Sequence, residues 1–144
     1  METDAKALLL GNEQKEANYR KLVRPRLMEQ LRDQIIDTLL LKKKYRVPTY
    51  SAAQLAADLN TNIRYISAVI RVQFHMNYAS LVNKYRVEEA MSLLADKRYA
   101  HLTIEDISYQ VGFQHRQSFY TAFTKFAGTT PNSYREQVAQ LSKK

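Results

Sequence analysis

Residues 103–131 read TIEDISYQVGFQHRQSFYTAFTKFAGTTP and have the pattern of two helices joined by a tight turn. Thr103, followed three residues later by Asp106, is typical of a capping box, in which the hydroxyl and the carboxylate satisfy free amides at a helix start. Gly112 predicts the turn, because glycine adopts backbone conformations that other residues avoid. Gly128 predicts the end of the second helix, since glycine is the preferred left-handed cap. The stretch therefore predicts a helix-turn-helix.

The same pattern occurs a second time, earlier in the chain. Ser51 and Gln54 match Thr103 and Asp106 at an offset of 52, and after the turn the offset becomes 53, so the second copy is one residue longer. Such a repeat predicts two similar subdomains. Apolar residues mark the core face of each longer helix, namely Ile66, Val69 and Ile70 in the first copy and Phe119, Ala122 and Phe123 in the second. Further N-caps are predicted at Asn62, Asn77 and Thr130, with Pro131 at the first position of the last helix.

Residues 78–96 connect the two copies and are predicted to form one continuous helix. Its apolar positions are Leu81, Val82, Tyr85, Leu93 and Leu94. At roughly 1.5 Å per residue such a helix spans about 28 Å, and B-DNA repeats its major groove every ~34 Å. The linker is therefore long enough to place the second helix of each copy in successive major grooves on one face of DNA.

The segment before the first copy carries a different pattern. Apolar residues recur every four positions from Leu27 to Leu39 and predict an amphipathic helix over residues 24–45, with Pro25 in its first turn and lysines 42–44 at its end. Residues 1–23 are weakly patterned, with Gly11 expected to break any helix, and we interpret them as a tail or the remnant of a linker. The predicted fold is thus all-α, with a segment 1–23, an amphipathic helix 24–45, and a double helix-turn-helix domain 46–140 whose units 46–77 and 98–137 flank the linker helix 78–96.

The basic segment Lys42–Arg46 has three open interpretations. Lysines complement the negative end of a helix dipole, which favours simple helix termination. Alternatively, the segment contacts phosphate beside the first unit. A third interpretation makes residues 24–45 an amphipathic target for a membrane surface or for a calmodulin-like partner.

Composition narrows the class of partner. The 144 residues carry 22 Lys and Arg against 14 Asp and Glu, a net charge of +8 that favours a polyanion such as nucleic acid. The longest apolar runs fall far short of the about 20 residues that cross a bilayer. We therefore expect a cytoplasmic, nucleoid-associated protein without membrane contact of its own.

Enzymatic motifs are missing from the sequence. Cysteine is absent, which excludes disulfides and thiolate metal sites. The three histidines, His75, His101 and His115, lack the spacing of metal ligands, and no phosphate loop, dinucleotide fingerprint or nucleophile motif occurs. We expect no enzyme activity, no metal and no cofactor.

Short motifs with a characteristic spacing cover residues 46–137. In the second half they are Ile104-Glu105-Asp106-Ile107-Ser108, Val111-Gly112-Phe113, Ser118-Phe119, Phe123, Lys125, Gly128-Thr129-Thr130-Pro131 and Tyr134-Arg135. In the first half they are Leu55-Ala56, Asn62, Tyr65-Ile66-Ser67, Tyr85-Arg86-Val87-Glu88-Glu89-Ala90 and Leu93-Leu94. Together they resemble the DNA-binding domain of AraC/XylS-type transcriptional regulators. The combination of Thr61-Asn62 with Tyr65-Ile66-Ser67 and Asn83-Lys84-Tyr85-Arg86 is similar to the version common in Bacteroidetes. The resemblance implies two helix-turn-helix units joined by a long helix, each with its second helix in a major groove.

Three positions depart from the family pattern, and one domain is missing. His75 stands where the family usually has glycine, His115 where it has a small N-cap such as serine, and Thr121 where a basic residue is frequent. His tolerates the left-handed conformation better than most residues. The family's separate ligand-sensing domain has no counterpart in this chain.

The second, longer helix of each copy is the predicted recognition helix, called the reading helix below. The outward faces of these two helices carry the candidate DNA contacts. Helical spacing from the core residues assigns base contacts to Arg64, Ser67, Ala68, Arg116, Gln117, Tyr120 and Thr121, and phosphate contacts to Arg71, Thr124 and Lys125. Arginine suits guanine O6/N7, glutamine suits adenine N6/N7, and a methyl group suits thymine. Arg86 is expected to make an orienting ion pair or a helix contact. The alternative for each candidate is an ordinary solvated helix face.

These observations predict sequence-specific binding of double-stranded DNA and regulation of transcription. Further expected partners are RNA polymerase and a sensor domain or other protein that engages the N-terminal helix. Two alternatives stay open: a helical protein-interaction module with the same fold, and sequence-blind, nucleoid-type binding through phosphate contacts.

Overall fold

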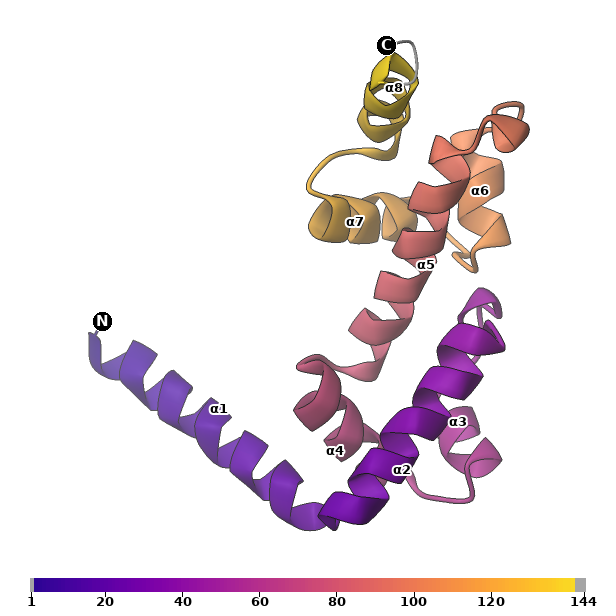
Figure 1. The fold of residues 1–144 in the computed structure, drawn as a ribbon. Helices are drawn as coiled ribbons and strands as arrows, with labels where there is room; N and C mark the ends of the chain where they lie inside the picture. Colours follow the sequence, from indigo (N-terminus) through magenta and orange to yellow (C-terminus); the bar gives the residue numbers. More distant parts are fainter. Residues whose placement is uncertain (1, 142–144) are drawn as a thin grey trace. The chain divides into compact units, whose positions relative to one another are not determined.

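The computed structural model describes residues 2–141, and for residues 2–10 and 12 the backbone alone. Every element in this range is a helix, which confirms the all-α prediction (Figure 1). In chain order the elements are α1 (Glu2–Leu22), α2 (Pro25–Ile35), the π-helix η1 (Ile36–Leu41), the 3-10 helix η2 (Lys44–Arg46), α3 (Ala52–Asp58), α4 (Ile63–Phe74), α5 (Tyr78–Ala95), the 3-10 helix η3 (Lys97–Tyr99), α6 (Ile104–Gln110), α7 (Arg116–Ala127) and α8 (Pro131–Leu141).

Backbone contacts divide the chain into two units. The first unit comprises the residues up to 42 together with residues 51–81, and the second comprises residues 43–50 together with the chain from 82 onward. Helix α5 begins in the first unit and ends in the second. The continuous linker helix expected over residues 78–96 is therefore present, ending one residue earlier.

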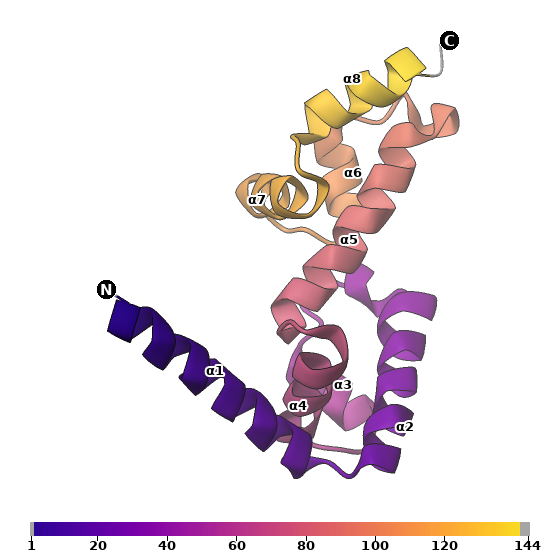
Figure 2. The same ribbon diagram turned by 60° about the vertical axis from the view of Figure 1, so that its left-hand side comes forward.

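The first unit is built around α4. Helices α1, α2 and α3 each pack against α4 (Figure 2). The apolar stripe of α2 and η1 supplies one side of the core, because Leu31, Ile35 and Leu39 are buried. Leu55 of α3 and Ile66, Val69 and Ile70 of α4 are also fully buried, as their helical spacing predicts.

The N-terminal region differs from expectation in two ways. Gly11 does not interrupt α1, which runs unbroken from Glu2 to Leu22. A glycine costs about 1 kcal/mol relative to alanine in a helix, which is too little to end a helix of this length. The predicted amphipathic helix is also not α-helical to its end, because its last turns form the π-helix η1. The Lys42 amide donates the final hydrogen bond, to the Asp37 carbonyl oxygen at 2.9 Å. Lys43 is left-handed, with φ 57°, and starts a new direction.

The second unit has an aromatic and aliphatic core between α5, α6 and α7. The buried side chains are Val87, Ala90, Leu93, Leu94, Ile107, Val111, Phe113, Phe119, Ala122 and Phe123. Phe119 lies at the centre of a ring cluster, with its centroid 5.3 Å from that of Phe113 and 5.6 Å from that of Phe123. Tyr134 of α8 extends this cluster, since its ring centroid lies 5.8 Å from that of Phe123.

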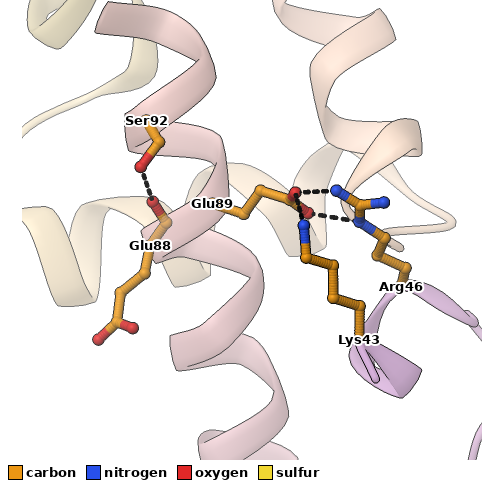
Figure 3. Close-up of polar contacts among 5 residues, drawn as sticks. All are labelled: Lys43, Arg46, Glu88, Glu89 and Ser92. Carbon is orange, nitrogen blue, oxygen red and sulfur yellow. Dashed lines mark hydrogen bonds and ion pairs between the residues drawn. The ribbon is translucent and has the colours of Figure 1, made fainter. Parts of the chain in front are cut away.

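Residues 43–50 belong to the second unit although both of their neighbours in sequence belong to the first. Glu89 of α5 holds this segment by an ion pair with the Arg46 guanidinium, whose Nε donates to Oε1 at 2.8 Å (Figure 3). The Lys43 ammonium lies 3.9 Å from the same carboxylate. Burial pushes the pKa of Glu89 upward, but hydrogen bonds from Arg46 and Tyr45 and the nearby positive charges outweigh it, so the pKa lies below its usual value. The carboxylate is therefore charged at neutral pH.

Arg86 binds the same segment from the neighbouring turn of α5. Its buried guanidinium donates to the carbonyl oxygens of Tyr45 and Val47 and lies 5.4 Å from the centroid of the Phe113 ring. The expected contact was an ion pair or a helix contact, whereas these hydrogen bonds of Arg86 go to backbone carbonyl oxygens of the 43–50 segment, one of them in η2.

Candidate nucleic-acid interface

The helix-turn-helix of the first unit is formed by α3 and α4. Ser51 and Gln54 form the predicted capping box at the start of α3. Asn60 takes a left-handed conformation in the turn, with φ 56°. The Thr61 amide then bonds back to the Ala56 carbonyl oxygen at 2.9 Å, and the Asn62 side chain accepts from the Tyr65 amide at 2.9 Å. Turn and N-cap together fix where α4 begins.

The second unit repeats this geometry with α6 and α7. Thr103 and Asp106 form the second capping box. Gly112 has φ 114°, and the Phe113 amide bonds back to the Ser108 carbonyl oxygen at 3.0 Å. This bond corresponds to that of Thr61 at the offset of 52 found in the sequence. The duplication is therefore a duplication of structure.

The far ends of the reading helices also correspond. His75 ends α4 with φ 59° and Gly128 ends α7 with φ 76°, so both are left-handed caps. His75 thus takes the conformation of the glycine that it replaces in the family pattern. Asn77 and Thr130 cap the next helices in both units, as predicted. The two units differ at the N-cap of the reading helix, because His115 makes no side-chain cap bond to any described residue, whereas Asn62 does.

Helix α4 presents a narrow outward face. Arg64 and Arg71 are exposed and Ser67 is half-buried, as expected of candidate contacts. Ala68 is not on this face: it is 0% exposed, so its prediction as a base contact is wrong. Because α1, α2 and α3 all pack on α4, the covered arc is wider than the core stripe alone suggests. The face instead includes Ile63, which is 50% exposed and was not among the predicted contacts.

Helix α7 presents a broader outward face. Arg116, Gln117, Thr121, Thr124 and Lys125 are exposed, and Tyr120 is half-buried. The Arg116 guanidinium lies 5.1 Å from the centroid of the Tyr120 ring, one helical turn away. The Lys125 ammonium lies 5.5 Å from the centroid of the adjacent Phe126 ring.

The cations on both reading helices are available for an external anion. The ion pairs among the described side chains, those of residue 11 and residues 13–141, use Arg20, Arg32, Arg46, Arg98 and lysines at 42, 43 and 84, besides a histidine contact. Arg64, Arg71, Arg116 and Lys125 are in none of them. The structure thus leaves two positively charged faces, one on each unit.

Helix α1 lies beside the C-terminal half of the α4 face. A hollow of about 310 Å³ there is lined by Lys15, Glu16, Tyr19 and Arg71. The Glu16 carboxylate also lies 4.0 Å from His75 Nδ1. Sequence reasoning missed this contact because residues 1–23 lack a clear apolar stripe. Asn60 was also missed, although asparagine is the residue after glycine most often found left-handed.

The described residues show no other kind of site. Among the side chains that the structure describes, no group of three or more histidine, aspartate or glutamate residues is arranged to hold a metal ion. Within the described part of the chain, no helix is both long enough and apolar enough to span a bilayer.

Comparison with known sequences decides the family. The pattern of the helix-turn-helix domain family matches residues 55–137, which is more than half of the chain. The chain belongs to this family. This is the AraC-type helix-turn-helix family, whose members are sequence-specific DNA-binding domains of transcription regulators. Such domains are not a class of enzymes.

Three individual proteins to which the chain is similar are regulators or domains of regulators. An uncharacterized HTH-type transcriptional regulator, YtdP, of Bacillus subtilis (strain 168) is 29% identical over 88 residues, which are 61% of this chain and 11% of that protein. The chain thus matches about a tenth of that regulator's length. The C-terminal domain of AraT, a response regulator from Geobacillus stearothermophilus, is 28% identical with a TM-score of 0.63, over 79% of this chain and 86% of that domain. A DNA-binding transcriptional dual regulator from Escherichia coli K-12 shares the fold, with 19% identity and a TM-score of 0.64 over 76% of this chain and 93% of that one.

Proposed function

We propose that this AraC-type domain binds two short blocks of base pairs in double-stranded DNA, one with each helix-turn-helix, and thereby regulates transcription. The observation that carries the proposal is the repeated geometry of the two turns, each followed by a helix whose outward face holds cations that form no ion pair with a described side chain. A single such unit is the established shape of a major-groove reader. Two of them in one chain suit an operator made of two blocks, centred about one helical turn apart.

The exposed residues divide into reading and positioning contacts. We assign base contacts to Arg64 and Ser67 on α4 and to Arg116, Gln117 and Thr121 on α7, with Tyr120 beside them. Phosphate contacts fall to Arg71, Thr124 and Lys125, which lie further along the two helices. Base contacts concentrate toward the N-terminal end of a reading helix, and phosphate contacts fix its register without reading sequence.

The contact of α1 with α4 supports a second part of the proposal. A sensor domain, RNA polymerase or another protein that engages α1 would act directly on the helix that carries Arg71. A Glu16→Lys variant tests this coupling in the full chain. It places a third cation beside Lys15 and Arg71, so it should tighten binding to any DNA at low salt if α1 stays against α4 in the complex. Unchanged affinity would count against the coupling.

Selection from random duplexes of about 25 base pairs at roughly 150 mM salt tests the main proposal. Two enriched blocks would support two-unit recognition and would define the operator. DNA that binds without enrichment would replace the proposal with sequence-blind binding, whose affinity falls steeply with salt. No bound DNA would favour the protein-interaction module instead.

A further inference from the structure

The pair formed by Arg116 and Tyr120 on α7 carries an inference that deepens the proposed function and rests on it. The two residues are four positions apart, so their side chains lie on one face of the helix. The guanidinium carbon lies 5.1 Å from the ring centroid, within the ~6 Å range of a cation–π contact. Arg116 is exposed, whereas the ring that it covers is half-buried.

The ring of Tyr120 is held in place from below. Its centroid lies 5.8 Å from that of Phe119, with the planes at 82°. Phe119 is 0% exposed and packs against Phe113 and Phe123 in the core. A row of rings thus connects the core of the second unit to the guanidinium of Arg116.

A guanidinium that lies with its flat face on an aromatic ring keeps its edge free. The N–H donors lie in the plane of the group, and they are the atoms that bind guanine O6 and N7 in a bidentate pair. We propose that Arg116 and Tyr120 act as one reading element, in which Tyr120 is a positioning residue and Arg116 recognises a guanine in the block of the second unit. Tyr120, which helical spacing alone marks as a base contact, then acts through Arg116.

The first unit lacks this element, although it has the same backbone. At the offset of 53, Arg116 corresponds to Ile63 and Tyr120 corresponds to Ser67. Ile63 is exposed and apolar, which suits the methyl group of thymine and offers guanine no donor. The two blocks of the operator therefore differ at this position, and the guanine marks which block the second unit reads.

The test measures base preference at each position of the selected operator for matched variants. Arg116→Ala should reduce the preference for guanine at one base pair by about ten-fold or more. Tyr120→Leu keeps apolar volume on Phe119 but removes the ring, and it should reduce the same preference by several-fold. Tyr120→Phe should keep it, because the stacking face remains. Ser118→Ala, an exposed residue of α7 to which no DNA contact is assigned, should leave that base pair unchanged.

A second readout does not need DNA. The Arg116 Nε–Hε resonance should be shifted by the Tyr120 ring in the wild type and in Tyr120→Phe, and the shift should disappear in Tyr120→Leu. A gain-of-function variant is the strictest measurement: Ile63→Arg with Ser67→Tyr should introduce a guanine preference into the first block.

The outcomes separate this inference from the function on which it rests. A wild-type protein that selects no motif overturns the proposed function, and the inference with it, before any variant is compared. A wild type that selects a motif, with Tyr120→Leu keeping full guanine preference or losing preference at a base pair other than that of Arg116, overturns the reading pair alone. Joint loss at one base pair with rescue by phenylalanine supports it.

Discussion

The Arg86 guanidinium donates through Nε to the carbonyl oxygen of Tyr45 at 2.7 Å. Gly112 in the turn of the second unit lies against the same atoms: a Cβ at this position would be 2.6 Å from the Tyr45 carbonyl oxygen and 2.9 Å from Arg86 Nε. The turn between α6 and α7 therefore packs, at Gly112, directly against the hydrogen bond by which Arg86 binds the 43–50 segment. A glycine that sequence reasoning assigns to the turn alone has two reasons to be there, its positive φ and its closeness to other backbone.

Gly112→Ala should be strongly destabilising. The left-handed conformation is strained for alanine, and the added methyl group also displaces a buried hydrogen bond, so we expect a loss of about 3 kcal/mol in the free energy of unfolding. Gly128→Ala is the matched control, since Gly128 has φ 76° with nothing within 4 Å of the added Cβ. It should cost only about 1 kcal/mol. Chemical denaturation of both variants measures the difference, and equal losses would contradict this packing at Gly112.

Acid should weaken the ion pair of Glu89 with Arg46, which attaches the 43–50 segment to α5. Because the folded pKa of Glu89 lies below its unfolded value, its contribution to stability is complete above the unfolded pKa of about 4.3 and disappears as the pH falls below it. Glu89→Gln should lower the free energy of unfolding at pH 7 by about 2 kcal/mol. It should also flatten the acid limb of a stability–pH curve. An acid limb parallel to that of the wild type would assign the loss to other carboxylates.

Alkali should lower stability by ionising Tyr45, which lies beside Glu89 and Arg46. Burial, followed by the charge of Glu89 and its hydrogen bond, raises the pKa of the Tyr45 hydroxyl to about 12. A raised pKa favours the neutral phenol in the folded state, so this contribution is complete below the unfolded pKa of about 10 and disappears as the pH rises toward 12. Tyr45→Phe cannot ionise. The difference in unfolding free energy between wild type and variant should therefore shrink between these pH values, and a constant difference would refute it.

Local signals in the sequence predicted much of the fold. Capping boxes, N-caps and left-handed caps depend on residues within about four positions of one another, and those at Ser51, Thr103 and Gly128 are all present. The duplication was visible for the same reason. Ala68 and α1 were misjudged because their burial depends on a helix packed from a distant part of the chain. Propensity and periodicity carry no information on such a contact. They also carry none on the hydrogen bonds of Arg86 to residues 43–50.

His115→Asn should stabilise the second unit. His115 has the extended backbone of an N-cap, with φ −129° and ψ 136°, but no side-chain cap bond to a described residue. Its counterpart Asn62 accepts a bond from the amide three residues on. An asparagine at 115 should therefore add about 0.5–1 kcal/mol to the free energy of unfolding. Asn62→Ala should subtract about 1 kcal/mol, and thermal unfolding of the two variants measures both changes. A destabilised His115→Asn would mean that the imidazole already stabilises this helix start.

Arg71 and Arg64 should differ in what they contribute to DNA binding, although both are exposed arginines on α4. A phosphate contact releases condensed counterions, so Arg71→Ala should weaken binding to every sequence by a similar factor and reduce the slope of log affinity against log salt by about 0.9. Arg64→Ala should instead reduce discrimination at one or two base pairs by ~1–3 kcal/mol. Arg26→Ala, an exposed arginine on α2, controls for the loss of charge alone. Titrations at several salt concentrations on the operator and on a scrambled duplex separate these effects. A salt slope unchanged in Arg71→Ala, with lost discrimination at one base pair, would exchange the roles of the two arginines.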